Sequence, residues 1–352
     1  AIDPRRPPEE RQERYARALL AEIGASAPEA ADTLHLGGGT PSLMSLEWLE
    51  RVVEAARSRF SLAGAEITLE ANPKDLGPEG YRRLRAIGVN RLSLGVQSVD
   101  PGVLKAMGRL HSADDAYRAF DGARGAGFDN VSLDFILGWP GETQERWERN
   151  LRAVEDLSPD HVSLYVLEVE GKTVLGHEAQ KGRLALPEDE LVATLYWETV
   201  AALERVGLRR YEISNFAREQ RESRHNLKYW DDQEFLGFGQ AAHSYRGAVR
   251  SWNAPTFVSY CRGIEESGRA RVGERILTPE DRIGEALFTG LRRREGVDLA
   301  RFSCRYGVNP LTLYAAGLAP SFEAGLVELQ AGWLRLTERG VLLSNEVFRA
   351  FV

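Results

Sequence analysis

The chain has 352 residues, of which 43% are hydrophobic and 28% are charged, so it is long enough to bury a large core. A formal net charge of -7 argues against a general nucleic-acid binder, which normally carries a basic face. No apolar run approaches the roughly 18 residues that a membrane span needs. The two cysteines, Cys261 and Cys304, lack metal-ligand spacing, so we expect two buried thiols in a reducing cytoplasm.

The first 217 residues alternate between strand-like and helix-like patterns. Short apolar or β-branched runs predict strands over 33–36, 66–70, 91–94, 130–135, 161–169 and 210–214. Helical periodicity, with capping or terminating residues at the ends, predicts helices over 45–60, 112–128 and 187–208. Repeated βα units of this kind imply parallel strands joined by helices, in either a barrel or a doubly wound sheet.

Polar residues stand where the predicted strands end. Glu70, Gln97 and Asp134 lie at or just beyond the C-terminal ends of three successive strands. In a barrel the loops that leave these ends converge on one mouth, whereas a doubly wound sheet builds its site from two neighbouring loops. Each of these residues alone suits a cap or a turn. Their distribution over successive strand ends favours the barrel.

The segment "LHLGGGTPS" places three glycines directly after the first of these strands. It lacks the spacing of a dinucleotide fingerprint and the Gly-Lys-Ser/Thr ending of a phosphate-binding loop. Bare backbone carbonyls and amides at a strand end can instead hold the ammonium and carboxylate groups of an amino-acid-like ligand, and Thr40 adds a hydroxyl.

Several motifs identify a family. The chain resembles the oxygen-independent coproporphyrinogen oxidase-like branch of the radical S-adenosylmethionine (SAM) enzymes over nearly its whole length. The motifs that carry the resemblance are "LHLGGGTPS", "EANP", "RLSLGVQS", "MGRLHS", "VSLDFILGWPGET", "HVSLYVLEVE", "YEISNFA", "HNLKYW" and "FGQAAHSY". Within that branch, "HNLKYW" and the modest length are similar to the heme chaperone subgroup, whereas the true oxidases are longer.

The resemblance implies a SAM site at the strand ends. The glycine-rich strand end receives the methionine part of SAM, Arg109 pairs with a carboxylate, and Asp134 hydrogen-bonds the nucleoside part. Taken alone, Arg109 suits a surface ion pair, but its place in the set favours the ligand. The residues that match the family's SAM site are Gly38, Gly39, Thr40, Glu70, Gln97, Arg109 and Asp134.

The family also holds a [4Fe-4S] cluster on three cysteines of a C-x3-C-x2-C loop that follows the first barrel strand. Neither that loop nor that strand is found in this sequence. We expect both to precede "AIDPRRPPEERQ" in the full-length protein, and we assign no metal ligand in this chain. The predicted fold class is therefore α/β: a partial parallel (β/α) barrel over residues 1–217, with a smaller helical accessory domain over 218–352.

"HNLKYW" places His225 close to Tyr229 and Trp230, and His243 follows in "AAHSY". An imidazole beside aromatic rings can ligate or flank a heme. Alternatively, the two aromatic residues belong to a core between domains, and His225 is a hydrogen-bonded anchor.

Two functions compete on this evidence. The first is a heme chaperone that binds heme and passes it to acceptor proteins, with the cluster and SAM regulating or supporting transfer. The second is an oxygen-independent coproporphyrinogen III oxidase, which decarboxylates propionate side chains; a weaker third is an enzyme that modifies or opens heme. We leave open whether the chain is catalytic. The resemblance implies heme or porphyrin as ligand, acceptor proteins and an electron donor as partners, a cytoplasmic location, and peripheral membrane association through acceptors.

Overall fold

The computed structural model describes residues 6–169 and 174–351, and its contacts divide the chain into two units. Unit 1 comprises Ala1–Glu13, Pro28–Arg210 and Ser214–Glu222. Unit 2 comprises Arg14–Ala27, Tyr211–Ile213 and Ser223–Val352. The division into residues 1–217 and 218–352 that we predicted from the sequence stays a proposal.

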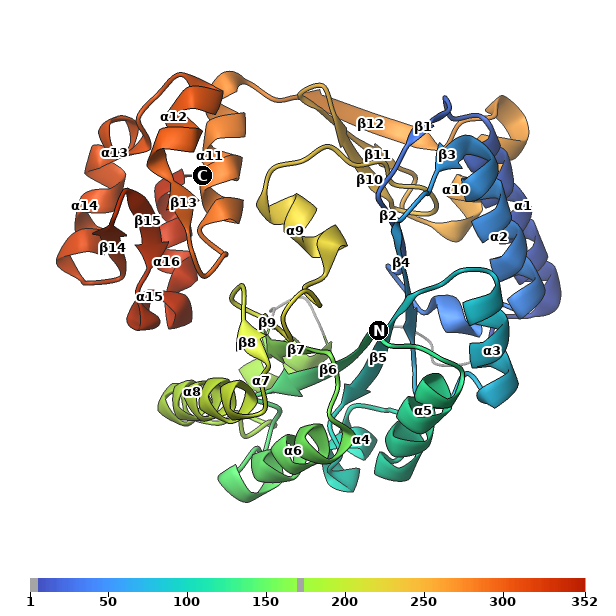
Figure 1. The fold of residues 1–352 in the computed structure, drawn as a ribbon, viewed down its shortest axis with the longest axis horizontal. Coiled ribbons are helices and arrows are strands. Elements are labelled where there is room, and N and C mark those ends of the chain that lie inside the picture. The colour runs from blue at the N-terminus through green and yellow to red at the C-terminus, as the bar shows by residue number, and fades with distance from the viewer. Residues whose placement is uncertain (1–5, 170–173, 352) are drawn as a thin grey trace. The chain divides into compact units, whose positions relative to one another are not determined.

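A seven-stranded sheet forms the centre of unit 1 (Figure 1). Its first five strands are parallel, β9 is antiparallel to β7, and β8 is antiparallel to β9. The edge strands β2 and β8 do not pair with each other, so the sheet is open, and the predicted partial barrel is confirmed. In spatial order the strands are β2 (Thr33–Leu36), β4 (Glu66–Ala71), β5 (Arg91–Gln97), β6 (Val131–Leu137), β7 (His161–Val166), β9 (Asn215–Ala217) and β8 (Arg209–Arg210).

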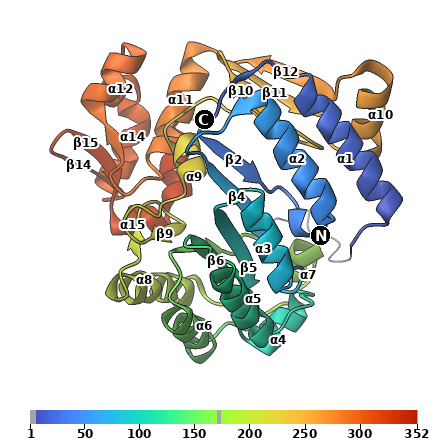
Figure 2. The ribbon, with the colours of Figure 1, turned by 45° about the vertical axis from the view of Figure 1, so that its right-hand side comes forward.

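Helices connect the parallel strands. Ser45 and Ser112 cap α2 and α5 as predicted, with each hydroxyl accepting a backbone N–H of the first turn. Figures 1 and 2 show α2, α3, α5 and α6 along one face of the sheet. The helices of unit 1 are η1 (Pro41–Leu43), α2 (Leu46–Arg59), α3 (Pro78–Ala86), α4 (Pro101–Ala106), α5 (Ala113–Gly125), α6 (Gln144–Leu157), α7 (Val174–Gln180) and α8 (Asp189–Arg205), and the short strands β1 (Glu29–Ala30) and β3 (Phe60–Ser61) pair beside them.

Two predicted strands differ from the structure. The strand predicted over 161–169 ends at Val166. The strand predicted over 210–214 is wrong, because β8 and β9 flank residues that belong to unit 2. The backbone N–H of Ile213 donates to the carbonyl of Arg292 at 3.1 Å, and Glu212 forms a β-bridge with Arg293. Because the backbone of residues 211–213 pairs within unit 2, these residues cannot extend the sheet of unit 1. Arg210 in β8 and the carbonyl of Ser214, which accepts from the N–H of Leu164 at 2.7 Å, do join that sheet.

The two faces of the parallel sheet have opposite chemistry. Side chains alternate between the faces along each strand, and the register aligns like with like across β2 to β7. One face carries apolar residues: Leu34, Leu36, Ile67, Leu69, Leu92, Leu94, Val131, Leu133, Phe135, Val162 and Leu164. The other face, termed here the polar face, carries His35, Thr68, Glu70, Arg91, Ser93, Ser132, Asp134, His161 and Ser163. Sheets covered on both faces normally have near-continuous apolar strands, so the alternation itself indicates a face with another purpose.

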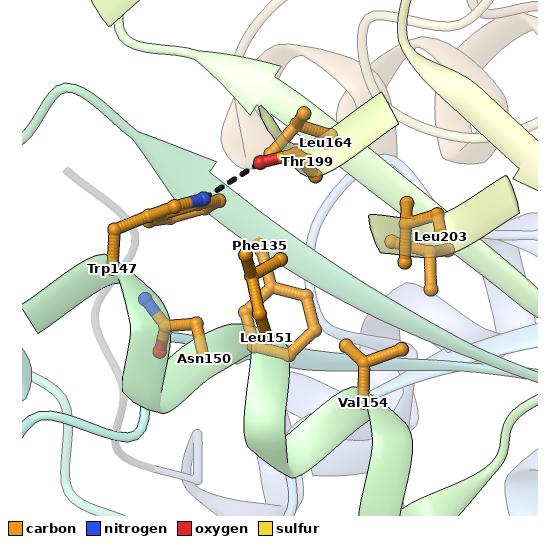
Figure 3. Close-up of a pocket in the computed structure, with 9 residues that line it drawn as sticks. Phe135, Trp147, Asn150, Leu151, Val154, Leu164, Thr199 and Leu203 are labelled. Carbon is orange, nitrogen blue, oxygen red and sulfur yellow. Dashed lines mark hydrogen bonds between the residues drawn. The ribbon is translucent and has the colours of Figure 1, made fainter. Parts of the chain in front are cut away.

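A small apolar cavity lies between the sheet and two helices of unit 1 (Figure 3). Phe135 and Leu164 contribute from the strands, and Val154 and Leu203 contribute from α6 and α8. The indole Nε1 of Trp147 donates to the Thr199 hydroxyl at 2.6 Å, which satisfies the polar groups beside the cavity (Figure 3). The cavity is therefore a packing gap on the apolar face of the sheet, opposite the polar face.

Unit 2 contains two three-stranded antiparallel sheets in addition to helices. Cys261 is buried in its core, whereas Cys304 is exposed, so the prediction of two buried thiols is wrong for Cys304. Its elements are α1 (Glu9–Gly24, from Arg14 onwards), α9 (Arg224–Trp230), β10 (His243–Arg246), β11 (Val249–Asn253), α10 (Phe257–Ser267), β12 (Arg271–Ile276), α11 (Pro279–Gly290), β13 (Val297–Asp298), α12 (Leu299–Tyr306), α13 (Pro310–Leu313), α14 (Ala315–Glu323), β14 (Val327–Gln330), β15 (Trp333–Leu336), α15 (Glu338–Leu342), α16 (Ser344–Phe348) and η2 (Arg349–Phe351).

Candidate functional site

The glycine run follows β2, and its members have different structural reasons to be glycine. A Cβ atom at Gly37 would lie 2.5 Å from Oε1 of Glu70 and 2.5 Å from Nε2 of His35. Gly38 has a φ of +78°, which side chains rarely adopt, while nothing lies within 4 Å of a Cβ at Gly39. Thr40 directly precedes η1. Gly37 is therefore the glycine against which other side chains pack closely. It stands one position before Gly38 and Gly39, the glycines predicted for the SAM site.

Glu70 near the end of β4 pairs with His35 of β2. Their Oε1 and Nε2 atoms are 2.9 Å apart, and both side chains are partly exposed. His35 was not predicted from the sequence. The two side chains meet at the place that a Cβ atom of residue 37 would occupy. The absence of a side chain at Gly37 therefore leaves the space for the pair.

Gln97 ends β5 with a φ of +65°, next to an irregularity in the pairing of β5 with β6. This left-handed conformation is strained for a residue with a side chain. The Gln97 amide lies beside Gly95, where a Cβ atom would be 2.9 Å from Nε2. The same Cβ would lie 3.8 Å from Oδ1 of Asn72. The Gln97 amide therefore lies close to the backbone of its own strand at Gly95.

Arg109 reaches the same segment. Its guanidinium donates to Oδ1 of Asn72 at 3.4 Å. Asn72 in turn donates to Asp75 at 3.0 Å, and the Ser42 hydroxyl donates to the same Asp75 oxygen at 2.5 Å. Burial lowers the pKa of Arg109, but a guanidinium remains a cation in proteins. Arg109 thus presents a positive charge tied through an amide to the loop that follows β2.

Asp134 is a half-buried carboxylate on the polar face of β6. The Ser93 hydroxyl lies 3.0 Å from its Oδ1 and 2.9 Å from its Oδ2. Burial raises the pKa of Asp134, and hydrogen bonds from Ser163 and Ser93 and the charge of Arg91 oppose that rise.

All seven residues predicted for the SAM site lie in unit 1. The glycine run and Thr40 follow β2, Glu70 and Gln97 lie at the C-terminal ends of β4 and β5, and Arg109 follows α4. Asp134, predicted at a strand end, lies in the middle of β6, because that strand continues to Leu137. Glu70 is in register with Ser93, which contacts Asp134, so these side chains follow one another across three strands. Arg109 contacts Asn72, which follows β4, and the Gln97 amide lies beside Gly95 of β5. The donor set comprises a cation, two carboxylates, an amide and bare backbone, which suits the carboxylate, ammonium and hydroxyl groups of an amino-acid nucleoside.

Sequence reasoning missed several polar-face residues, among them His35, Arg91 and His161. The signal was present as a two-residue alternation, for example "RLSLGVQ" in β5 and "VSLDF" in β6. These runs predict strands, and their alternation also indicates that one face of the sheet is polar.

His225 lies in unit 2, on the seven-residue helix α9, and no residue of that helix is fully buried. Its Nε2 is 2.9 Å from the Tyr229 hydroxyl, and the two rings meet edge to face with centroids 5.1 Å apart. Tyr229 packs edge to face on Phe235 at 4.8 Å. His225 is thus hydrogen-bonded to the first of two aromatic side chains that pack edge to face. This geometry is compatible with both predictions, a histidine that ligates or flanks heme and a hydrogen-bonded structural anchor.

Both ends of α9 are fastened within unit 2. The Ser223 hydroxyl caps its first turn by accepting the backbone N–H of Asn226. Beyond its C-terminus, Arg293 pairs with Asp231, and Asp232 accepts hydrogen bonds from Arg305 at 3.1 Å and from the Tyr306 hydroxyl at 2.6 Å. The Arg292 guanidinium lies 4.5 Å from the Trp230 ring centre. "HNLKYW" is therefore held by the C-terminal part of the chain.

Across the ranges 6–169 and 174–351, no cluster of three His, Cys, Asp or Glu side chains is arranged to hold a metal ion. The described residues therefore do not fit an iron-sulfur cluster, which needs such a set. Among these same residues, no helix combines the length and apolarity needed to cross a membrane.

Two family models match the sequence. Residues 3–154 match the radical SAM superfamily, and residues 277–343 match the HemN C-terminal domain. The second match includes Arg292, Arg293 and Arg305, which fasten α9 or contact its tryptophan.

Similar proteins cover nearly the whole chain. The heme chaperone HemW of Bacillus subtilis (strain 168) is 38% identical over 336 residues, which are 95% of this chain and 89% of that protein. The heme chaperone HemW of Mycobacterium tuberculosis (strain ATCC 25618 / H37Rv) is 37% identical over 97% of this chain and 86% of that protein. The solved structure of coproporphyrinogen III oxidase HemN from Escherichia coli, a radical SAM enzyme, superposes with a TM-score of 0.85 at 25% identity, over 98% of this chain and 84% of that one.

Proposed function

This chain belongs to the HemW family of the radical SAM superfamily, and from that premise we propose that it binds heme and passes it to acceptor proteins. The observation that carries the proposal is similarity to named heme chaperones along nearly the whole chain. In the full-length protein we propose a [4Fe-4S] cluster and SAM beside this activity. We further propose that the protein has an electron donor as partner and that it is located in the cytoplasm. It would contact membranes only through its acceptor proteins.

We propose that SAM binds along the strand ends of unit 1, at Gly38, Gly39, Thr40, Glu70, Gln97, Arg109 and Asp134. The support is chemical: the Arg109 cation suits the ligand carboxylate, and the Asp134 carboxylate suits a donor on the nucleoside. When bound, SAM would supply a sulfonium group. The residues named here would orient it through its carboxylate, ammonium and hydroxyl groups.

Arg109→Ala is expected to weaken SAM binding to the full-length, cluster-loaded protein by about tenfold to a hundredfold, since a hydrogen bond to a charged group contributes about 1.5 to 3 kcal/mol. Gln97→Ala should act in the same direction. Titration calorimetry measures both affinities. Arg118→Ala is the matched control, because this exposed arginine pairs only locally with Asp115 on α5. Wild-type affinity in both site variants would remove them from the SAM site.

For heme we propose the surface around α9, with His225 as an axial ligand. Tyr229 and Phe235 present apolar ring surface beside it. Coordination through Nε2 requires that nitrogen to leave the Tyr229 hydroxyl, so the tyrosine competes with the iron for His225. Heme binding here uses side chains of unit 2 and needs no iron-sulfur chemistry.

His225→Ala is expected to change the Soret spectrum of the heme-bound protein and to weaken heme binding, because the axial imidazole is lost. Tyr229→Phe keeps the ring and removes the competing hydroxyl, so it should retain the ligand field. His243→Ala is the histidine control, since His243 stacks on Trp252 outside α9. An unchanged spectrum in His225→Ala would leave the histidine as a structural anchor, and absence of saturable heme binding would reject the site.

The second candidate function is oxygen-independent coproporphyrinogen III oxidation, favoured by the superposition with HemN along the whole chain. The sequence identity to that oxidase is 25%, against 38% to the heme chaperone of Bacillus subtilis, so the chaperone function has the stronger support. Incubating the reduced, full-length, cluster-loaded protein with coproporphyrinogen III and SAM separates the two. Loss of carboxyl groups from the porphyrinogen would favour the oxidase.

A further inference from the structure

The surroundings of Asp134 extend further than a ligand site needs. Four buried side chains of β5, β6 and β7 make or support hydrogen bonds to this carboxylate, and we term them the Asp134 cage: Ser93, Ser132, Ser163 and His161. All four lie on the polar face: Ser93, Ser132 and His161 are in register across β5, β6 and β7, and Ser163 is in register with Asp134. Ser132 and His161 have no exposed surface, so neither can contact a ligand directly.

Three hydroxyls of the cage donate to Asp134. Ser93 reaches both carboxylate oxygens, Ser132 lies 3.2 Å from Oδ1, and Ser163 adds a further hydrogen bond. A carboxylate has about four acceptor positions, and an ionised one can only accept. Most of the acceptor capacity of Asp134 is thus used inside the protein, and little remains for a ligand.

The direction of the hydrogen bonds is set by His161. Its Nδ1 lies 2.8 Å from the Ser132 hydroxyl. Burial and the charge of Arg91 hold the pKa of His161 well below its ordinary value, so the ring is neutral. If the Ser132 hydrogen points to Asp134, the Ser132 oxygen must accept from Nδ1–H of His161. The tautomer of a buried imidazole therefore fixes the orientation of a hydroxyl aimed at the carboxylate.

We propose that the cage side chains are positioning residues that hold Asp134 as an ionised, oriented acceptor with room for one donor group of a ligand. Such a carboxylate accepts a hydroxyl or amino group and rejects a group that can only accept. The inference deepens the proposed SAM site and rests on it, since the donor would be a hydroxyl of the nucleoside. The other charged groups facing Asp134 within unit 1 are Glu70 on β4 and Arg91 on β5.

The first test needs no cofactor. The difference in unfolding free energy between Asp134→Asn and wild type is measured against pH, and again in a Ser93→Ala/Ser132→Ala background. Without the two hydroxyls the carboxylate should ionise less readily, so the pH dependence of the difference should move up by about one pH unit. Identical pH dependence in the two backgrounds overturns the inference. If the double variant does not fold, Ser93→Ala alone is used in the same comparison.

The second test is SAM affinity of the full-length, cluster-loaded protein at pH 6 and pH 8.5. The double variant should lose about tenfold more affinity at pH 6 than at pH 8.5. Ser321→Ala removes a buried serine hydroxyl of α14 as control. An equal loss at both pH values would make the cage merely structural and overturn the inference. If instead Asp134→Asn binds SAM normally, the proposed SAM site fails, while the cofactor-free test still decides the cage.

Discussion

Glu142→Gln is expected to become more stable relative to wild type as the pH rises, with the gap widening by about 2 to 3 kcal/mol between pH 5 and pH 8.5. Glu142 lies in the "GWPGET" turn after β6 and is only 6% exposed. Burial raises the pKa of its carboxyl from an ordinary 4.5 to about 7, with Arg146 opposing and Asp100 adding to the rise. Its Oε1 has no hydrogen-bond partner among the described residues.

The sign follows from the raised pKa of Glu142. Between pH 4.5 and pH 7 the unfolded chain releases this proton while the folded protein keeps it. The contribution to stability is therefore full below about pH 4.5 and is lost as the pH rises through 7. The glutamine side chain is uncharged at every pH, so the Glu142→Gln variant does not lose this stability as the pH rises.

Denaturant unfolding at a series of pH values measures the gap for Glu142→Gln. Glu148→Gln is the matched control on α6, since the Glu148 side chain is 47% exposed and pairs loosely with Arg152 at 3.8 Å. Its gap to wild type should stay almost constant with pH, because exposed pairs contribute little. A constant gap for Glu142→Gln as well would mean that its carboxylate finds compensation in the turn.

Gly37→Ala is expected to preserve the fold and to weaken SAM binding by roughly tenfold to a hundredfold. The new methyl group would occupy the place where Oε1 of Glu70 meets Nε2 of His35. Both atoms are the ends of side chains that can swing aside, so the cost falls on the pair and not on the backbone. Glu70 would then leave its position beside the glycine run.

Gly125→Ala provides the matched comparison for Gly37→Ala. It adds the same methyl group at the end of α5, outside the proposed SAM site, where nothing lies within 4 Å and the backbone needs no positive φ. Calorimetric titration measures the SAM affinity of both variants, and thermal unfolding measures their stability. Together they distinguish an effect on the binding site from an effect on the fold. We expect near wild-type SAM affinity from Gly125→Ala. Equal affinities in both variants and wild type would show that the Glu70–His35 pair does not serve SAM binding.

Much of the sheet could be predicted because its strands are short, apolar and bounded by turn residues. The first predicted strand, 33–36, coincides with β2, and Ser45 and Ser112 begin helices where their capping chemistry indicated. The segment 210–214 could not be predicted in the same way. Its backbone partners lie some 80 residues further along the chain, around Arg292, and local patterns carry no information about such a pairing.

Residue chemistry at single positions was also visible in the sequence. The acids Glu70 and Asp134 and the amide of Gln97 indicated a polar site on the sheet, and the motifs supplied the family. The sequence placed Asp134 at a strand end, whereas β6 continues beyond it to Leu137. The exposed Cys304 was missed, because a lone cysteine has no periodic pattern that reports its burial.

The sequence by itself determined the alternation of strands and helices, the family and the residue types of the site, because these depend on local periodicity and motif order. Only the tertiary structure decided which side chains contact one another. Glu70 meets His35 beside Gly37, and Asp134 accepts hydrogen bonds from the cage hydroxyls. The physical reason is that cross-strand register sets these contacts, and register follows from how whole strands pack, not from the residues near either partner.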